Sequence, residues 1–64
     1  MFTATEKLAC AKRELRYRID VYKRLVADGK MSERQATREI AIMGAIVDDY
    51  SEVVKRESPE LELE

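Results

Sequence analysis

Few side chains in this sequence have the chemistry of a catalytic site. Cys10 is the only cysteine and the chain has no histidine, so a thiol nucleophile lacks a neutral-pH base and a zinc ion lacks a ligand set. Asp48 and Asp49 are adjacent, but neighbouring helical residues point about 100° apart and cannot share a proton or a metal ion. We therefore expect no enzymatic activity, no metal and no cofactor, with Cys10 buried as a small apolar side chain.

A basic segment, KRELRYRIDVYKR, is the second candidate for chemistry, because cations along one helix can contact the phosphates of a nucleic acid. Residues 1–30 contain eight Lys or Arg and four acidic residues, whereas residues 31–64 contain four and nine. Tyr17 could stack on a base. The candidate phosphate contacts are Lys12, Arg13, Arg16, Lys23 and Arg24.

Pairing of these cations with acidic residues is the interpretation that we favour. A pI near 5.5 is low for a dedicated nucleic-acid-binding protein. If the chain folds back on itself, the expected pairs are Lys12–Asp49, Arg13–Asp48 and Lys23–Glu39. Much of the basic surface is then neutralised across a hairpin or a dimer interface, and nucleic-acid binding stays the alternative.

All these side chains fall on two predicted helices. Thr3 and Glu6 have the spacing of a capping box, which starts a helix at residue 4. Gly29 suits the left-handed conformation that follows a helix end, and Ser32 suits the cap of the next helix. The sequence therefore predicts helices over about 4–28 and 33–57, joined by a turn at 29–32.

Each predicted helix carries an apolar stripe with the helical period, and a short turn makes the helices antiparallel neighbours. The first stripe is Leu8, Ala11, Leu15, Ile19, Tyr22 and Val26. The second is Ala36, Ile40, Met43, Val47, Tyr50 and Val54. Folding at the turn pairs them one to one, with Ile19 opposite Met43. The predicted fold class is all-α, an antiparallel two-helix hairpin over residues 1–58.

Further apolar residues lie outside these stripes and would be exposed on a single hairpin. Gly44, inside the second helix, costs about 1 kcal/mol relative to alanine, which favours the close approach of another helix or an aromatic ring to the small residues Ala41, Gly44 and Ala45. The alternative is that Gly44 lies on a solvated face. We predict that two hairpins pair into a dimeric four-helix bundle. The predicted oligomer interface is Tyr17, Val21, Leu25, Ala41, Ile42, Gly44, Ala45, Ile46 and Val53.

The length of the chain also favours a homodimer. A core of 64 residues rarely gives more than about 3–5 kcal/mol without a disulfide, a metal or an oligomer interface. No apolar run is long enough for a membrane span, and we expect a cytoplasmic location. Pro59 should end the second helix, because proline disfavours helical geometry before it, and residues 59–64 should form a flexible acidic tail.

Three segments carry a resemblance: REL--R--VY, formed by Arg13, Glu14, Leu15, Arg18, Val21 and Tyr22, then V--GKMS and REIAIM-AIV. In these, most of the chain resembles short uncharacterised proteins encoded in phages and prophages. The resemblance implies a phage accessory setting and carries over no site residue. In architecture alone, the chain is also similar to the Rop-type RNA-binding hairpin dimers of plasmids, without a shared motif.

The predicted function is a non-enzymatic, self-associating interaction module. One alternative is a dimer that binds RNA or DNA through the basic side of the first helix. Another is a phage inhibitor that presents the acidic flank of the second helix to a host protein. The predicted partners are thus a second copy of the chain and a host or phage protein, with nucleic acid as a weaker candidate.

Overall fold

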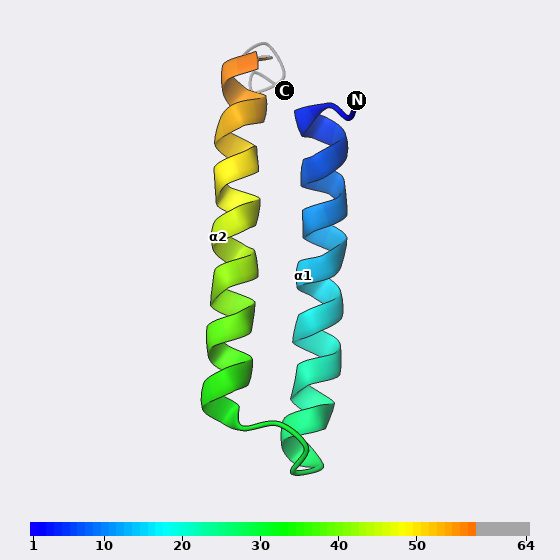
Figure 1. Ribbon diagram of the computed structural model, residues 1–64, viewed down its shortest axis with the longest axis vertical. Coiled ribbons are helices and arrows are strands. Elements are labelled where there is room, and N and C mark those ends of the chain that lie inside the picture. The colour runs from blue at the N-terminus through cyan, green and yellow to red at the C-terminus, as the bar shows by residue number, and fades with distance from the viewer. Residues whose placement is uncertain (58–64) are drawn as a thin grey trace.

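The computed structural model describes residues 1–57 and consists of two long helices. Helix α1 spans Ala4–Ala27 and helix α2 spans Glu33–Glu57. They run antiparallel, side by side, and are joined by a short turn at the end opposite the N-terminus (Figure 1). The described residues contain no strand, so the predicted all-α hairpin is confirmed. The predicted helix stop at Pro59 and the tail over 59–64 lie outside the described residues.

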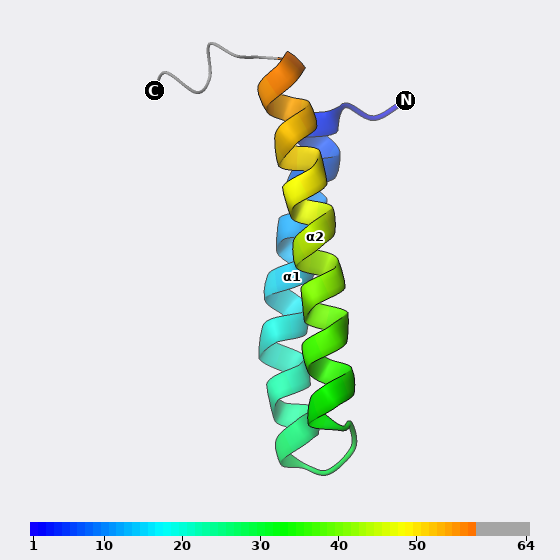
Figure 2. The same ribbon diagram turned by 90° about the vertical axis from the view of Figure 1, so that its left-hand side faces the viewer.

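The two helices form a single layer. Turned by a quarter, the molecule shows α2 in front of α1, with nothing from residues 1–57 covering either side of the pair (Figure 2). The hairpin therefore has a narrow contact seam between the helices and two broad faces. Neither helix in the described part is long and apolar enough to cross a membrane.

The first turn of α1 is held by the predicted capping box. The Thr3 hydroxyl accepts a hydrogen bond from the Glu6 N–H at 3.1 Å, and the Thr3 N–H donates to Glu6 Oε1 at 2.9 Å. These bonds occupy amide donors that have no partner inside the helix. The bond from the Thr3 backbone and then the bond from its hydroxyl lower the pKa of Glu6.

The turn between the helices follows from Gly29. Its φ is +73°, in the left-handed region that glycine adopts without a steric cost. The Gly29 N–H donates to the Val26 carbonyl at 3.0 Å, and the Lys30 N–H donates to the Leu25 carbonyl at 2.8 Å. This is the Schellman pattern, which satisfies the last carbonyls of α1 while the chain reverses.

The start of α2 is capped by Ser32, whose hydroxyl accepts a hydrogen bond from the Gln35 N–H at 3.0 Å. Within residues 1–57, the Ser32 N–H does not donate to the Gln35 side chain, so the reciprocal bond of a capping box is not formed. The sequence thus predicted the correct cap residue, and Ser32 caps α2 through this one hydrogen bond.

The core of the hairpin is small. Within residues 1–57, only Ala11, Ala36 and Met43 are buried, at 7%, 6% and 7% exposure. The other seam residues of the two stripes are half-buried, because each touches one neighbouring helix and faces water on its other side. They are Leu8, Leu15, Tyr22, Val26, Ile40, Val47, Tyr50 and Val54.

Ile19 is the one member of the predicted stripes that stays exposed, at 46%. Position 18 lies three residues after Leu15 and four before Tyr22, so it continues the helical stripe as well as position 19 does. The structure turns Arg18 toward α2, where its guanidinium donates to the Glu39 carbonyl at 3.2 Å. The prediction that Ile19 is buried opposite Met43 is therefore wrong.

Candidate functional site

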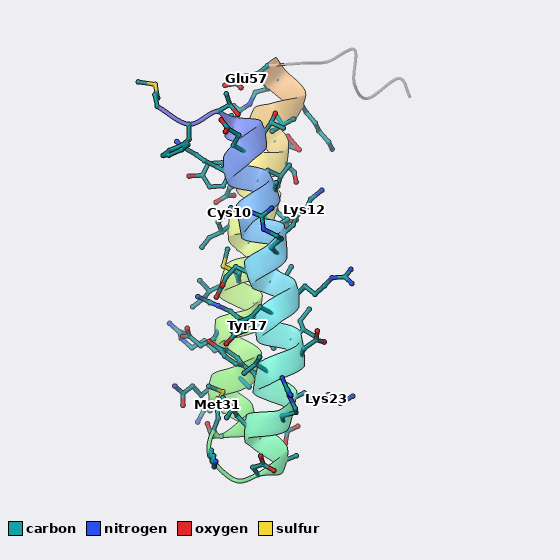
Figure 3. The ribbon with its side chains drawn as sticks, turned by 90° about the vertical axis from the view of Figure 1, so that its right-hand side faces the viewer. Cys10, Lys12, Tyr17, Lys23, Met31 and Glu57 are labelled. Atoms are coloured by element: carbon teal, nitrogen blue, oxygen red, sulfur yellow. The ribbon has the colours of Figure 1, made fainter. Side chains whose placement is uncertain are left out.

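The surfaces that can act on other molecules are the two faces of the hairpin. Figure 3 shows Cys10 and Tyr17 on one side of α1, and Lys12 and Lys23 on the other. We call the first side the tyrosine face and the second the groove face. Each face combines one flank of α1 with one flank of α2.

The buried residue Met43 divides the flanks of α2. Ile40 and Val47 lie about 60° and 40° from it around the helix in one direction, and Ile42 and Ile46 lie about 100° and 60° in the other. Ile40 and Val47 line the grooves that hold Lys12 and Lys23, so Ile42 and Ile46 belong to the opposite side. The tyrosine face therefore comprises Cys10, Tyr17, Val21, Leu25, Ile42, Ile46 and Val53.

Two adjoining grooves run along the groove face and share Ile19. The first, of about 580 Å³, is lined by Lys12, Leu15, Arg16, Ile19, Asp20 and Val47. The second, of about 320 Å³, is lined by Ile19, Tyr22, Lys23, Val26, Glu33, Ala36, Thr37 and Ile40. The apolar lining residues come from the two predicted stripes, and the charged ones come from the outer flanks. The grooves thus have an apolar floor and a charged rim.

The centre of the tyrosine face is charged. Arg18 Nε lies 3.0 Å from Glu14 Oε1, and Arg18 Nη1 lies 3.8 Å from Glu39 Oε1 on α2. The hydrogen bond to Glu14 raises the pKa of Arg18, a side chain that is charged in proteins even without this bond. Glu14 precedes Tyr17 by three residues and Glu39 precedes Ile42 by three, so the cluster borders the exposed apolar residues of this face.

The predicted ion pairs Lys12–Asp49, Arg13–Asp48 and Lys23–Glu39 are not formed. Within residues 1–57, none of the five basic candidates makes an ion pair within 4.0 Å. Figure 3 shows Lys12 and Lys23 on the groove face, and Glu39 contacts Arg18 instead. Asp49 follows Ile42 by seven residues and Ile46 by three, so it lies toward the tyrosine face. Lys12, Arg16 and Lys23 line the grooves together, while Arg13 and Arg24 are not among the groove residues.

The structure divides the predicted oligomer interface. Gly44 lies two residues from Ile42 and two from Ile46, which corresponds to a rotation of about 200° around the helix. Gly44 is therefore on the other flank of α2. It follows the groove residue Thr37 by seven residues, which places it on the groove face. A Cβ added to Gly44 would meet no atom within 4 Å, so the space beside it is open. Ala41 and Ala45 are exposed on the outer side of α2.

Cys10 is exposed, so the prediction of a buried cysteine is wrong for the single hairpin. It lies on the flank of α1 that α2 does not cover, one helical turn before the partly exposed Glu14. The grooves themselves were missed by the sequence reasoning. The small residues Thr37, Gly44 and Ser51 share one flank of α2 at a seven-residue spacing, but only Thr37 among them lines a groove, so this spacing was a partial signal. Comparison with protein-family models, curated proteins and solved structures found no match.

Proposed function

We propose that this chain is a non-enzymatic interaction module that works as a homodimer, with two hairpins packed into a four-helix bundle. The observation that carries the proposal is the size of the core. Three residues are buried within residues 1–57, and no side chain there is less than 2% exposed. A domain of this length needs a source of stability beyond its own core. These residues can provide one through an interface between two copies of the chain.

Partly exposed apolar side chains on both faces support the same proposal. Tyr17 is 59% exposed, Ile19 is 46% exposed and Ile42 is 41% exposed. Complete burial of one large apolar side chain contributes about 1.5–3 kcal/mol. Several such side chains together therefore approach the ~5–15 kcal/mol that stabilises an ordinary domain. A second copy of the hairpin would recover part of this free energy by covering one face.

Analytical ultracentrifugation over a wide concentration range tests self-association directly. We expect a mass of twice 7.4 kDa at micromolar concentration, and a urea midpoint that rises with protein concentration because dimerisation stabilises only the folded state. A well-folded monomer at every concentration, with a urea midpoint independent of concentration, would contradict the proposal.

Nucleic-acid binding is the second candidate. Among residues 1–57 the five basic candidates form no ion pair, which favours this candidate more than the sequence did. If it is correct, labelled RNA or DNA duplexes bind at physiological salt. The combined replacement of Arg13, Arg16 and Arg24 by Gln then weakens binding and flattens its dependence on salt concentration. If the module only associates with itself, fluorescence anisotropy detects no binding by either protein.

The biological setting of the proposal is a phage or prophage accessory protein that acts in the cytoplasm. The phage setting rests on the resemblance carried by the segments REL--R--VY and REIAIM-AIV, and the cytoplasmic location rests on the composition of the chain. A pull-down from host lysate, compared between the natural protein and a variant that does not dimerise, tests whether a further partner binds.

A further inference from the structure

We propose that a second copy of this chain packs on the groove face, and that the turns of the two hairpins lie at the same end of the bundle. This inference rests on the proposed self-association and adds the surface and the arrangement. The groove face has two adjoining grooves with apolar floors, from Leu15 and Val47 to Val26 and Ala36. In a four-helix bundle, these floors of two hairpins meet on the bundle axis.

The tyrosine face is the less favourable surface because of the charges at its centre. Arg18 contacts Glu14 at 3.0 Å and reaches Glu39 on the other helix. A second copy laid over this cluster would remove water from three charged groups, a cost that the ion pairs do not fully repay. On the groove face, the charged residues stand at the rim, where they stay hydrated when the floor is covered.

The height of each residue along the hairpin sets its position in such a dimer. Leu15 of α1 and Val47 of α2 line the same groove, so they lie at about the same height along the hairpin. Because the helices are antiparallel, any two residues of α1 and α2 at the same height have numbers that add up to about 62. A twofold axis parallel to the helices keeps these heights and sets α1 of one copy beside α2 of the other. Ile19 then lies level with residue 43 and beside Gly44 of the second copy.

Gly44 and Ile19 are complementary in shape in this arrangement. Ile19 is an exposed branched side chain on the groove face, and Gly44 has open space where a Cβ would stand. A twofold axis makes the contact twice, because each copy offers one Ile19 and one Gly44. Helix packing of this kind inserts a large side chain between residues of the facing helix.

Charge favours the same arrangement over its alternative. Lys12 and Arg16 are level with residues 50 and 46, so Asp48 of the second copy lies midway, within about 3 Å along the axis of each. Asp48 follows Gly44 by four residues and therefore shares its flank. With the turns at opposite ends, α1 would lie beside α1, and the cations lining both grooves would face each other.

A matched pair of variants tests the face. Ile19→Glu and Ile42→Glu change the same residue type at similar exposure, 46% and 41%, on opposite faces. We expect Ile19→Glu to raise the dimer dissociation constant at least ~100-fold and Ile42→Glu to change it less than ~3-fold. A larger effect of Ile42→Glu, or equal effects of both, would overturn the assignment of the face. Circular dichroism at each concentration separates lost association from lost helix.

A distance measurement tests the arrangement without disturbing either face. Lys30→Cys in a Cys10→Ser background allows one spin label at each turn, where the side chain is exposed. Turns at the same end should give a distance of roughly 10–25 Å, whereas turns at opposite ends are separated by the helix length, about 36 Å for 24 residues. The longer distance would overturn the arrangement. A monomeric natural protein would instead refute self-association itself.

Discussion

The two faces of the hairpin both carry a row of apolar side chains, and they differ in where their charges lie. On the tyrosine face, Arg18 and two glutamates stand between Tyr17 and Ile42, at the centre of any contact. On the groove face, charged side chains border an apolar floor. If two hairpins associate as proposed, the position of charge relative to the seam decides which helical face the second copy covers.

Met43 lies in the buried seam between the two faces, and its replacement should have the largest effect on stability. It is 7% exposed at the seam. Met43→Ala should lower the free energy of unfolding by about 2–5 kcal/mol, because the lost contacts leave a cavity. Urea unfolding at fixed protein concentration measures this. Met31→Ala, at a partly exposed position beside the turn, is the matched control. Equal losses in both variants would mean that the seam contributes little.

Removing the charges of the tyrosine face should make the two faces alike. The triple variant Glu14→Leu, Arg18→Met and Glu39→Leu replaces the cluster by apolar side chains of similar size. We expect assemblies larger than a dimer, because each hairpin then has two faces that another copy can cover. Sedimentation velocity measures the change. Arg34→Met, at an exposed position near the start of α2, should stay dimeric. A triple variant that remains a dimer would contradict the role given to the cluster.

Gly44 and its neighbour Ala45 provide a test within α2. Gly44→Leu fills the open space that receives Ile19, so we expect the dimer dissociation constant to rise about 30-fold or more. Ala45→Leu adds the same side chain on the outer side of α2 and should change the constant less than ~3-fold. Both variants should retain their helix content by circular dichroism. If Ala45→Leu weakened association as much, the small residue at position 44 would have no special place in the interface.

Asp48 and Asp49 are adjacent but lie on opposite flanks of α2, so reversing the charge of each one tests one face at a time. Asp48→Arg sets a cation beside Lys12 and Arg16 of the second copy and should weaken association about tenfold at low salt, and less at high salt. Adding Arg16→Asp should restore the affinity, because the charges are then exchanged. Asp49→Arg, on the flank toward the tyrosine face, should have little effect. A failure of the double variant to recover would argue against the arrangement with turns at one end.

Local signals in the sequence were enough to predict the helices and their ends. Thr3 with Glu6, Gly29 and Ser32 each act through hydrogen bonds or backbone conformation within a few residues. The antiparallel fold followed from the shortness of the turn. These features depend on neighbours in sequence, so they can be predicted without knowing how the two helices rotate about their axes.

The features that depend on helix rotation were predicted less well. Positions 18 and 19 continue the stripe of α1 equally well, and only the packed hairpin shows that Arg18 turns inward and Ile19 stays exposed. The same rotation decides which flanks of α1 and α2 share a face. Without it, the sequence reasoning placed Gly44 and Ile42 in one interface and paired Lys12 with Asp49, although each pair lies on opposite sides of the molecule.

Replacing Thr3 in the capping box at the start of α1 should have the smallest effect on stability and association, because it leaves both faces unchanged. The pKa of Glu6 is lowered in the folded chain, so its contribution to stability is present above the ordinary pKa of glutamate and is lost as the pH falls through the lowered value. Thr3→Ala removes the hydroxyl but keeps the backbone donor, which is the larger cause of the shift. The pKa should therefore return only partly.

Carboxyl titration by NMR measures the pKa of Glu6 in each variant, with Thr5→Ala as the control on the same exposed turn. The dimer dissociation constant should stay within about twofold, because the box lies at the end of the helix and contacts neither face. A full return of the pKa in Thr3→Ala would show that the hydroxyl, rather than the backbone N–H, holds the carboxylate. A weakened dimer would show that the interface extends to this end of the hairpin.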